Sequence, residues 1–327
     1  MAYFPLVMAG WLVHSISCFY LIRTIRHALI RTILTLAPCI LLTHIGCQDL
    51  TKIHFFSILT VSLYWMMSIR LIHLTVLSPN KLMTFHSFVF QILWNIFPIV
   101  SSKSIENQWP IIVDFISVIM KVTVNHWLYE WLLSCEPNDS YARITMFYFA
   151  LLTTSYMTDM QTGFIRLITR DEYTLEPFTN FPLFSRSLRD FWGRRYNRLV
   201  GTVLKESLFQ PLNLYISSRE IMTLITFIVS GLLHVHIVIV VFNDVSSALS
   251  TFAFFIVNGI ACGIEAYMKI QLPQPLGSLV THLFLLLTAP MCIGIYTREA
   301  AYFPVNVPPL YDNKWIPKFS IPSVCPK

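Results

Sequence analysis

Two short groups of residues in this sequence combine chemically capable side chains with unusual surroundings. The first is the run 185–206, SRSLRDFWGRRYNRLVGTVLKE, in which Asn197 lies among arginines and aromatic rings. The second is SGLLHVH at 230–236, which places His234 near the middle of an apolar segment. Apolar surroundings favour the neutral imidazole, because burial penalises the charged form. A neutral imidazole accepts a proton, so His234 is a candidate general base, and a core histidine bonded to a neighbouring helix is the alternative.

The run 185–206 also fits a simpler description. Its apolar residues approximate a stripe, and its basic residues supply a positive face, which is typical of a helix that lies in a membrane interface. The basic residues are Arg186, Arg189, Arg194, Arg195, Arg198 and Lys205. This description explains neither Asn197 within the patch nor Gly193 within the helical pattern. A binding or catalytic role therefore stays open as the second interpretation.

The composition indicates the environment in which these groups are positioned. Of 327 residues, 55% are hydrophobic and only 12% are Asp, Glu, Lys or Arg, whereas an ordinary soluble domain has about 25% charged residues. With a mean hydropathy of +0.61, the chain is neither disordered nor collagen-like, and it is unlike most soluble enzymes. The net charge of +6 fits basic residues at the cytosolic ends of membrane spans. No basic stripe accompanies a nucleic-acid-binding motif, so we expect no nucleic-acid partner.

About nine segments reach the roughly 20 apolar residues that a transmembrane helix needs. They cover about 4–22, 28–46, 54–77, 84–101, 110–133, 144–165, 221–242, 247–268 and 277–296. We therefore predict an all-α polytopic membrane protein of roughly 8–10 transmembrane helices, with one membrane-embedded domain over 1–327. The segment 84–101 is the weakest, because it is short and contains Pro98.

The interval 166–220 interrupts this pattern with nine Lys or Arg and six Asp or Glu. A long polar loop inside a compact bundle is usually functional. Its positive surplus favours the cytosol, and so do the arginines that follow the first span. The loop after the first span and the interval 166–220 both lie on the cytosolic side of the membrane only if one predicted span between them is re-entrant, interfacial or miscounted. The proline-rich tail over 302–327 is expected to be extended and peripheral.

Some predicted spans carry ionisable residues, which are costly in lipid and point into the bundle or toward the interface. Asp114 and Lys121 are seven apart on one helix face, which fits either a relay or local pairing. The seven cysteines form no C-x-x-C pair, so we expect small buried hydrophobic residues rather than a disulfide framework or a zinc site. His234 and His236 face different sides of a helix, and we expect no metal.

Together the two groups resemble the wax synthase branch of the membrane-bound O-acyltransferases. In that family a loop motif of the form FWGRRWN precedes a membrane-embedded histidine in an SG-x-x-H motif. Here the loop reads FWGRRYN over 191–197 and SGLLH follows over 230–234, with Asn197 and His234 37 residues apart. Two positions differ from the family. Tyr196 stands where Trp is usual, and Val235 stands where an acidic residue often follows the histidine.

The resemblance implies transfer of an acyl group from acyl-coenzyme A to the hydroxyl of a lipid alcohol, which gives a wax ester when the acceptor is a long-chain alcohol. His234 would take the hydroxyl proton, and Asn197 would donate a hydrogen bond to the acyl donor or to the developing negative charge. The residues implied in binding acyl-coenzyme A are Phe191, Trp192, Arg194, Arg195 and Arg198. Acyl-coenzyme A is a co-substrate, and no separate cofactor is expected.

The resemblance further implies a helical bundle around a reaction chamber and a location in the endoplasmic reticulum membrane, among membrane lipids. Three alternatives remain. The first is the same chemistry on a sterol, a glyceride or a secondary metabolite. The second is a membrane transporter, although the sequence has no inverted repeat. The third is a catalytically silent relative that binds lipid. The sequence does not specify an oligomeric state.

Overall fold

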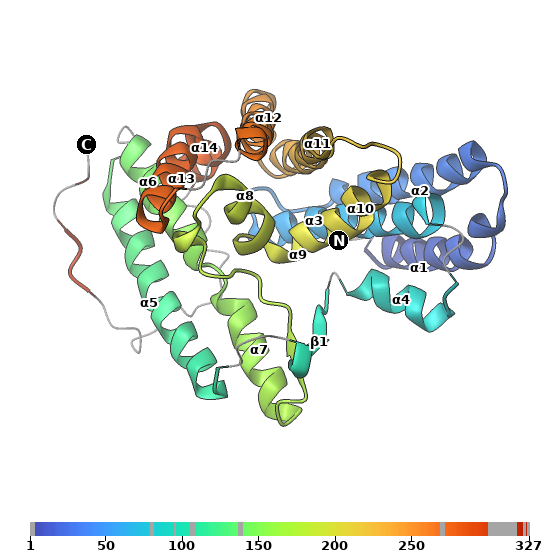
Figure 1. Ribbon diagram of the computed structural model, residues 1–327, viewed down its shortest axis with the longest axis horizontal. Helices are drawn as coiled ribbons and strands as arrows, with labels where there is room; N and C mark the ends of the chain where they lie inside the picture. The colour runs from blue at the N-terminus through green and yellow to red at the C-terminus, as the bar shows by residue number, and fades with distance from the viewer. Residues whose placement is uncertain are drawn as a thin grey trace.

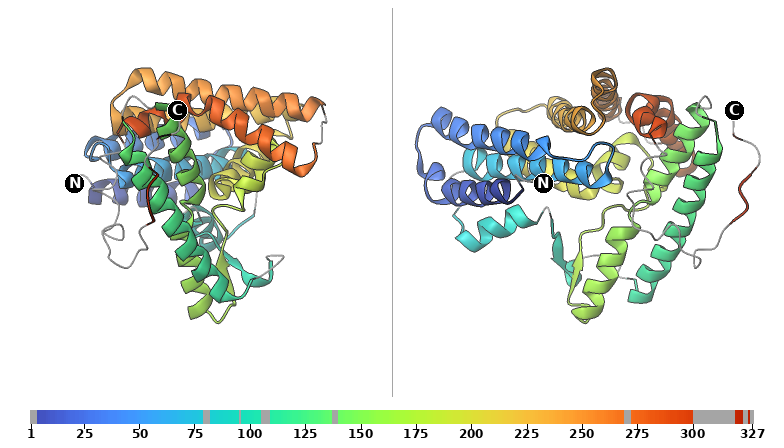
Figure 2. Two further views of the ribbon diagram at one scale, coloured as in Figure 1. Left: turned by 90° about the vertical axis from the view of Figure 1, so that its left-hand side faces the viewer. Right: turned by 180° about the vertical axis from the view of Figure 1, so that it is seen from behind.

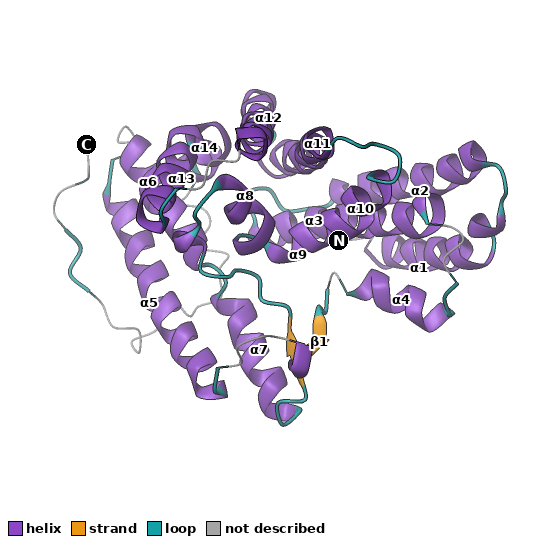
Figure 3. Ribbon diagram, viewed as in Figure 1, coloured by secondary structure: helices purple, strands orange, loops and turns teal. Residues whose placement is uncertain are grey.

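The computed structural model describes a chain that is mostly helical. The described residues are 4–78, 82–94, 96–104, 109–136, 140–268, 272–299, 319–322 and 325. Three helical groups surround a central loop region in Figure 1, and Figure 2 shows the same arrangement from the side and from behind. Figure 3 shows that the described strands are short and lie at the margin of the helical bundle.

The N-terminal group lies at the right of Figure 1. Its helices are α1 (Phe4–Tyr20), α2 (Ala28–Gln48), α3 (Phe55–Ile72) and α4 (Phe85–Leu93). The turn η1 (Ile22–Thr24) follows α1, and the π-helical turn η2 (His73–Leu77) continues α3. Trp11, Val61 and Leu71 are buried between these helices, whereas many other apolar side chains face outward. Apolar residues on all sides are typical of a helix whose outer face meets lipid.

The second group contains α5 (Ile111–Ser134), α6 (Ser140–Thr153) and α7 (Tyr156–Ile168). Two ion pairs join α5 to α7. Lys121 lies 2.5 Å from Asp159, and Asp114 lies 2.6 Å from Arg166. Asp114 and Lys121 therefore pair locally with α7 rather than with each other. Pairing of this kind lowers the cost of charges inside an apolar bundle.

The C-terminal group contains α11 (Arg219–Ile237), α12 (Val245–Met268), α13 (Gln274–Thr288) and α14 (Pro290–Arg298). The π-helical turn η7 (Val238–Phe242) continues α11. Gly231 lets α11 and α12 approach closely, because a Cβ atom there would lie 3.1 Å from the Cβ atom of Phe255. The helices α13 and α14 form a pair bent by 60°.

The central region begins where β2 (Tyr173–Leu175) pairs antiparallel with β1 (Ile99–Ser101), with Val100 opposite Thr174. Short helical segments occupy the rest of this region. They are η3 (Ser102–Ser104), η4 (Pro182–Phe184), α8 (Leu188–Asp190), η5 (Phe191–Arg195), α9 (Arg198–Leu204), η6 (Lys205–Phe209) and α10 (Gln210–Leu212). In Figure 1, α8 to α10 lie between the N-terminal group, α5–α7 and the helices α11 and α12.

The predicted fold class, an all-α polytopic membrane protein, is confirmed. By length and composition, six described helices could cross a membrane, and the bent pair of α13 and α14 raises this number to seven. The predicted span 84–101 is wrong, because α4 ends at Leu93 and the chain then enters β1. The predicted span 144–165 is divided between α6 and α7. Of the described helices long enough to cross a membrane, α2, α3 and α5 lie between the two basic loops, so the number of crossings between these loops is still odd. Most of the tail 302–327 lies outside the described residues.

The prediction for the cysteines was correct for five of them and wrong for two. Cys135, at the end of α5, forms a disulfide with Cys325 in the C-terminal tail. The two residues are 190 positions apart in the sequence, so only the fold brings them together. The other cysteines are buried and unpaired, and they are Cys18, Cys39, Cys47, Cys262 and Cys292.

Candidate active site

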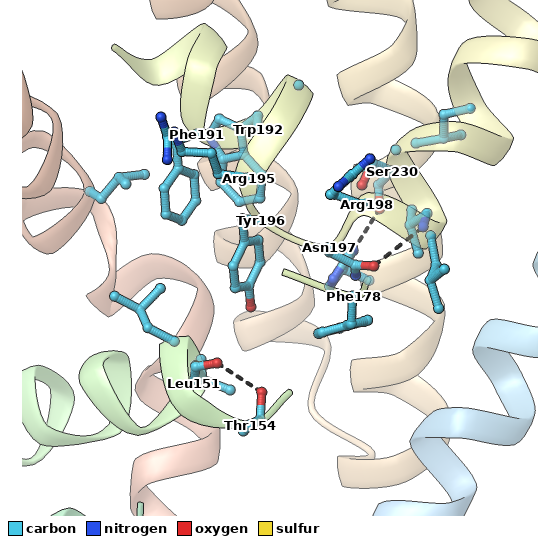
Figure 4. Close-up of a pocket in the computed structure, with 18 of the residues that line it drawn as sticks. Leu151, Thr154, Phe178, Phe191, Trp192, Arg195, Tyr196, Asn197, Arg198 and Ser230 are labelled. Atoms are coloured by element: carbon cyan, nitrogen blue, oxygen red, sulfur yellow. Dashed lines mark hydrogen bonds between the residues drawn. The ribbon is translucent and has the colours of Figure 1, made fainter. Parts of the chain in front are cut away.

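A cavity of about 1,960 Å³ lies where the central region meets α3, α6, α11 and α12. It exceeds the roughly 300–1,000 Å³ of common small-molecule pockets. All of the predicted site residues line it, namely Phe191, Trp192, Arg194, Arg195, Asn197, Arg198 and His234. Figure 4 shows Trp192, Tyr196, Asn197 and Ser230 among the lining side chains. The structure therefore brings the loop motif and the histidine to one chamber.

His234 lies in the last part of α11, a helix whose first turn is capped by the side chain of Ser218. The Nδ1 atom of His234 lies 2.8 Å from the carbonyl oxygen of Ser230, one turn earlier. A carbonyl only accepts hydrogen bonds, so Nδ1 carries a hydrogen, and in the neutral ring Nε2 then keeps its lone pair. The ring of Phe255 packs against the imidazole, with 4.3 Å between ring centroids. His234 thus has a fixed orientation, and in its neutral form Nε2 is the nitrogen that accepts a proton.

Asn197 stands between the π-helical turn η5 and α9 in a left-handed conformation with φ of 43°. Asn tolerates this conformation better than most residues do. Its Oδ1 accepts a hydrogen bond of 3.3 Å from the backbone N–H of Val200, which caps α9. Because the N–H of Val200 holds Oδ1 in place, the side-chain NH₂ group of Asn197 remains available to donate hydrogen bonds into the chamber.

The aromatic residues of the motif form one packed cluster. Phe191 and Tyr196 stack with 5.0 Å between centroids and 12° between planes, and Trp192 meets both rings edge-on. The indole N–H of Trp192 donates to Oδ1 of Asn258 on α12 over 3.1 Å. Burial raises the pKa of Tyr196 to about 12, so its hydroxyl stays neutral. Tyr196 therefore fills the place of the family's Trp as a stacking ring.

The arginines of the motif divide into two kinds. Arg195 lies 2.7 Å from Asp190 and also donates to the carbonyls of Asn180 and Phe181, and Arg198 forms an ion pair with Glu176. These two guanidinium groups already hold the loop together. Arg194 is exposed, and within the described part of the chain its side chain makes no hydrogen bond or ion pair. Arg194 is therefore the guanidinium with its donors available to a phosphate.

The two histidines of SGLLHVH have different surroundings. His236 accepts a hydrogen bond of 2.9 Å from Nε1 of Trp65 on α3. Among the described residues, no group of three His, Cys, Asp or Glu side chains could hold a metal.

Val235 packs into the apolar cluster of Val238 and Ala248. Val235 supplies no carboxylate next to His234, and the group that orients the imidazole is the carbonyl of Ser230.

Sequence reasoning missed two residues that hold the motif in place. Glu265 of α12 accepts hydrogen bonds from the backbone N–H groups of Leu188 and Arg189. Asn258, also on α12, accepts from Trp192. The only sequence signal for Glu265 was its charge inside an apolar span, and Asn258 gave none.

This chain is similar to known proteins over the segment that contains the candidate site. Residues 175–257 match the family described as "Membrane bound O-acyl transferase family". In Arabidopsis thaliana, "Probable long-chain-alcohol O-fatty-acyltransferase 9" is 34% identical over 29% of this chain and 30% of its own length. "Acyl-CoA--sterol O-acyltransferase 1" is 29% identical over 35% of this chain and 36% of its own length. "Probable long-chain-alcohol O-fatty-acyltransferase 3" is 27% identical over 78% of this chain and 76% of its own length.

The matched family segment begins at β2 and extends into α12, so it contains both the motif and His234. The similarity to the first two relatives spans about a third of their lengths. The predicted resemblance to the wax synthase branch of the membrane-bound O-acyltransferases is confirmed.

Proposed function

We propose that this protein is an O-acyltransferase that moves an acyl group from acyl-coenzyme A to the hydroxyl of a lipid alcohol, with a long-chain alcohol as acceptor. The observation that carries the proposal is the fixed tautomer of His234 in a chamber that Asn197 also lines. The names of the similar proteins support it, since they describe acyl transfer to long-chain alcohols and to a sterol.

In the proposed reaction, Nε2 of His234 takes the proton of the alcohol while the alcohol oxygen attacks the thioester carbonyl carbon. A positioned base of this kind contributes about 10²–10⁴-fold to the rate. The NH₂ group of Asn197 donates to the carbonyl oxygen, on which negative charge develops. When the C–S bond breaks, the proton on Nε2 passes to the thiolate of coenzyme A, which leaves as a thiol. The products are the ester and coenzyme A, and His234 regains its neutral form.

Binding of the donor draws on the exposed guanidinium of Arg194, which pairs with a phosphate of coenzyme A. Phe191 and Trp192 are apolar side chains that line the same cavity. Arg195 and Arg198 serve mainly to hold the loop, because both are already paired with carboxylates. We place the protein in the endoplasmic reticulum membrane, where membrane lipids supply the acceptor.

A sterol acceptor is the second candidate, because one of the similar proteins is named for sterol acylation. The test is expression in a host that lacks neutral-lipid acyltransferases, with labelled oleoyl-coenzyme A and equal amounts of dodecanol, hexadecanol, cholesterol and diacylglycerol. We expect fatty-alcohol esters to dominate the products. If a sterol ester is the dominant product, the acceptor in the proposal becomes a sterol instead of a long-chain alcohol. No ester from folded protein refutes the activity and favours the silent lipid-binding relative or the transporter.

A further inference from the structure

We propose that Asn258 and Glu265 are positioning residues for acyl transfer, which hold the motif helix (residues 188–195) in a fixed position relative to His234. The inference rests on the proposed function, because it concerns the same chamber. Neither residue belongs to the motif or to the histidine segment. Both lie on α12, seven positions apart and therefore on one face, which is the face that meets the motif helix.

Glu265 completes the start of the motif helix. The first N–H groups of any helix have no partner within the helix. Here Oε1 and Oε2 of Glu265 accept from the N–H groups of Leu188 and Arg189 over 3.1 and 3.0 Å. The next N–H, that of Asp190, donates to the hydroxyl of Ser187. A carboxylate is also the favourable charge at this end of a helix dipole.

Asn258 anchors the same helix one turn further on, through a side chain. It is fully buried, and its NH₂ group donates to the carbonyl of Phe254 over 2.9 Å. This bond turns Oδ1 toward Trp192, whose indole N–H donates to it over 3.1 Å. The motif helix is thus held at its first backbone amides and at its central indole. Two separated anchors restrict both its translation along α12 and its rotation.

The same helix α12 also sets the position of the histidine. Phe255, three residues before Asn258, packs against the imidazole of His234 at 4.3 Å between centroids. It also meets the ring of Trp192 at 6.2 Å. One rigid helix therefore contacts both halves of the site, and the anchors fix how the end of the motif helix, with Asn197 after it, faces His234.

This arrangement predicts a loss of turnover when an anchor is removed. A displacement of about 1 Å in a catalytic arrangement can cost about 100-fold in rate. In Glu265→Gln, one acceptor oxygen is replaced by an NH₂ group that faces a backbone donor. In Trp192→Phe, the indole donor is lost while an aromatic ring remains. We expect kcat to fall about 10- to 100-fold in each variant, with the KM for oleoyl-coenzyme A changed less than about threefold in Glu265→Gln.

The experiment combines these rates with hydrogen–deuterium exchange of the purified full chain in detergent. Glu265→Gln should accelerate exchange at the amides of Leu188 and Arg189 and leave α11 as protected as in the wild type. Tyr267→Phe is the matched control, because Tyr267 lies two residues from Glu265 on α12 and is 81% exposed. It should change neither exchange nor turnover.

A double-mutant cycle tests the second anchor. If Trp192 and Asn258 act through their shared hydrogen bond, Asn258→Leu combined with Trp192→Phe should lower kcat no further than the more damaging single variant. Asn258→Asp keeps an acceptor oxygen for the indole but loses the NH₂ donor to Phe254, so it should keep more turnover than Asn258→Leu and less than the wild type. Additive losses in the cycle contradict the anchor.

Two further results overturn the inference. One is unchanged exchange at Leu188 and Arg189 in Glu265→Gln, and the other is faster exchange with unchanged kcat. Failure of the proposed function gives a different result, since the wild type would then form no ester while exchange at the two amides still depended on Glu265. In that case Glu265 would still hold the motif helix, but not for acyl transfer, and both the inference and the proposed activity would be refuted.

Discussion

The role of Asn197 can be separated from its contribution to the fold, because the two use different atoms of one side chain. The Oδ1 atom caps α9, and the NH₂ group is left for the substrate. Asn197→Asp keeps the cap, since Asp and Asn are equally good at this position. Asn197→Gly accepts the φ of 43° without strain and lacks the cap, which costs only a few tenths of a kcal/mol. Both variants should therefore fold with nearly the stability of the wild type.

Both variants nevertheless lose the hydrogen-bond donor. Loss of one donor to a developing oxyanion costs about 10²–10³ in kcat, or about 2.7–4 kcal/mol of transition-state stabilisation. Asn197→Ala is less informative, because it adds the loss of the cap, about 1 kcal/mol, to left-handed strain of about 1–2 kcal/mol.

The assay for these variants is the initial rate of labelled ester formation from oleoyl-coenzyme A and the best acceptor, with melting temperature measured on the same preparations. We expect both variants to melt within a few degrees of the wild type and to lose at least about 100-fold in kcat. The neutral Gly variant separates loss of the donor from the added charge of Asp. Retention of kcat within about threefold of the wild type in either variant refutes the role of the NH₂ group.

Three further predictions concern other parts of the chain. Arg166→Met should lower the free energy of unfolding by about 3 kcal/mol, because it leaves Asp114 without its buried partner, whereas Arg298→Met, at an exposed pair, should cost far less in a thermal melt. Arg194→Ala should raise the KM for acyl-coenzyme A with little effect on the melt, since this guanidinium is exposed and makes no hydrogen bond or ion pair among the described residues. The Arg166 guanidinium also holds the pKa of Asp171 below its ordinary value. The stability from this pair is therefore complete above about pH 4 and is lost as the pH falls through the lowered pKa. Melts between pH 6 and 3 should show a smaller loss of stability for Asp171→Asn than for the wild type.

The sequence predicted the parts of the site that are local in the chain. The motif over 191–197 and the histidine segment over 230–234 are contiguous, so their residues could be chosen from type and spacing, and they do line one cavity. The apolar runs likewise predicted most of the long helices. The segment 84–101 misled this reasoning because apolar composition alone does not distinguish a short helix followed by a strand from a span.

The sequence could not predict which distant residues meet. Glu265 is 76 residues from Arg189, and Asn258 is 66 residues from Trp192, so no periodicity connects these pairs. Cys135 and Cys325 gave no spacing signal for the same reason. The pairing of Asp114 with Arg166, rather than with Lys121 on its own helix, likewise depends on how α5 and α7 pack. Contacts of this kind follow from the packing of helices and are absent from local patterns.

The most direct measurement of the central claim compares two histidines on one helix. His234→Ala removes the proposed base, and His236→Gln alters the histidine that contacts Trp65 instead of the chamber. Both variants should insert into the membrane and melt close to the wild type. We predict that ester formation from labelled oleoyl-coenzyme A falls by at least about 10²-fold in His234→Ala and stays near the wild-type rate in His236→Gln. Ester formation at the wild-type rate by folded His234→Ala contradicts the account.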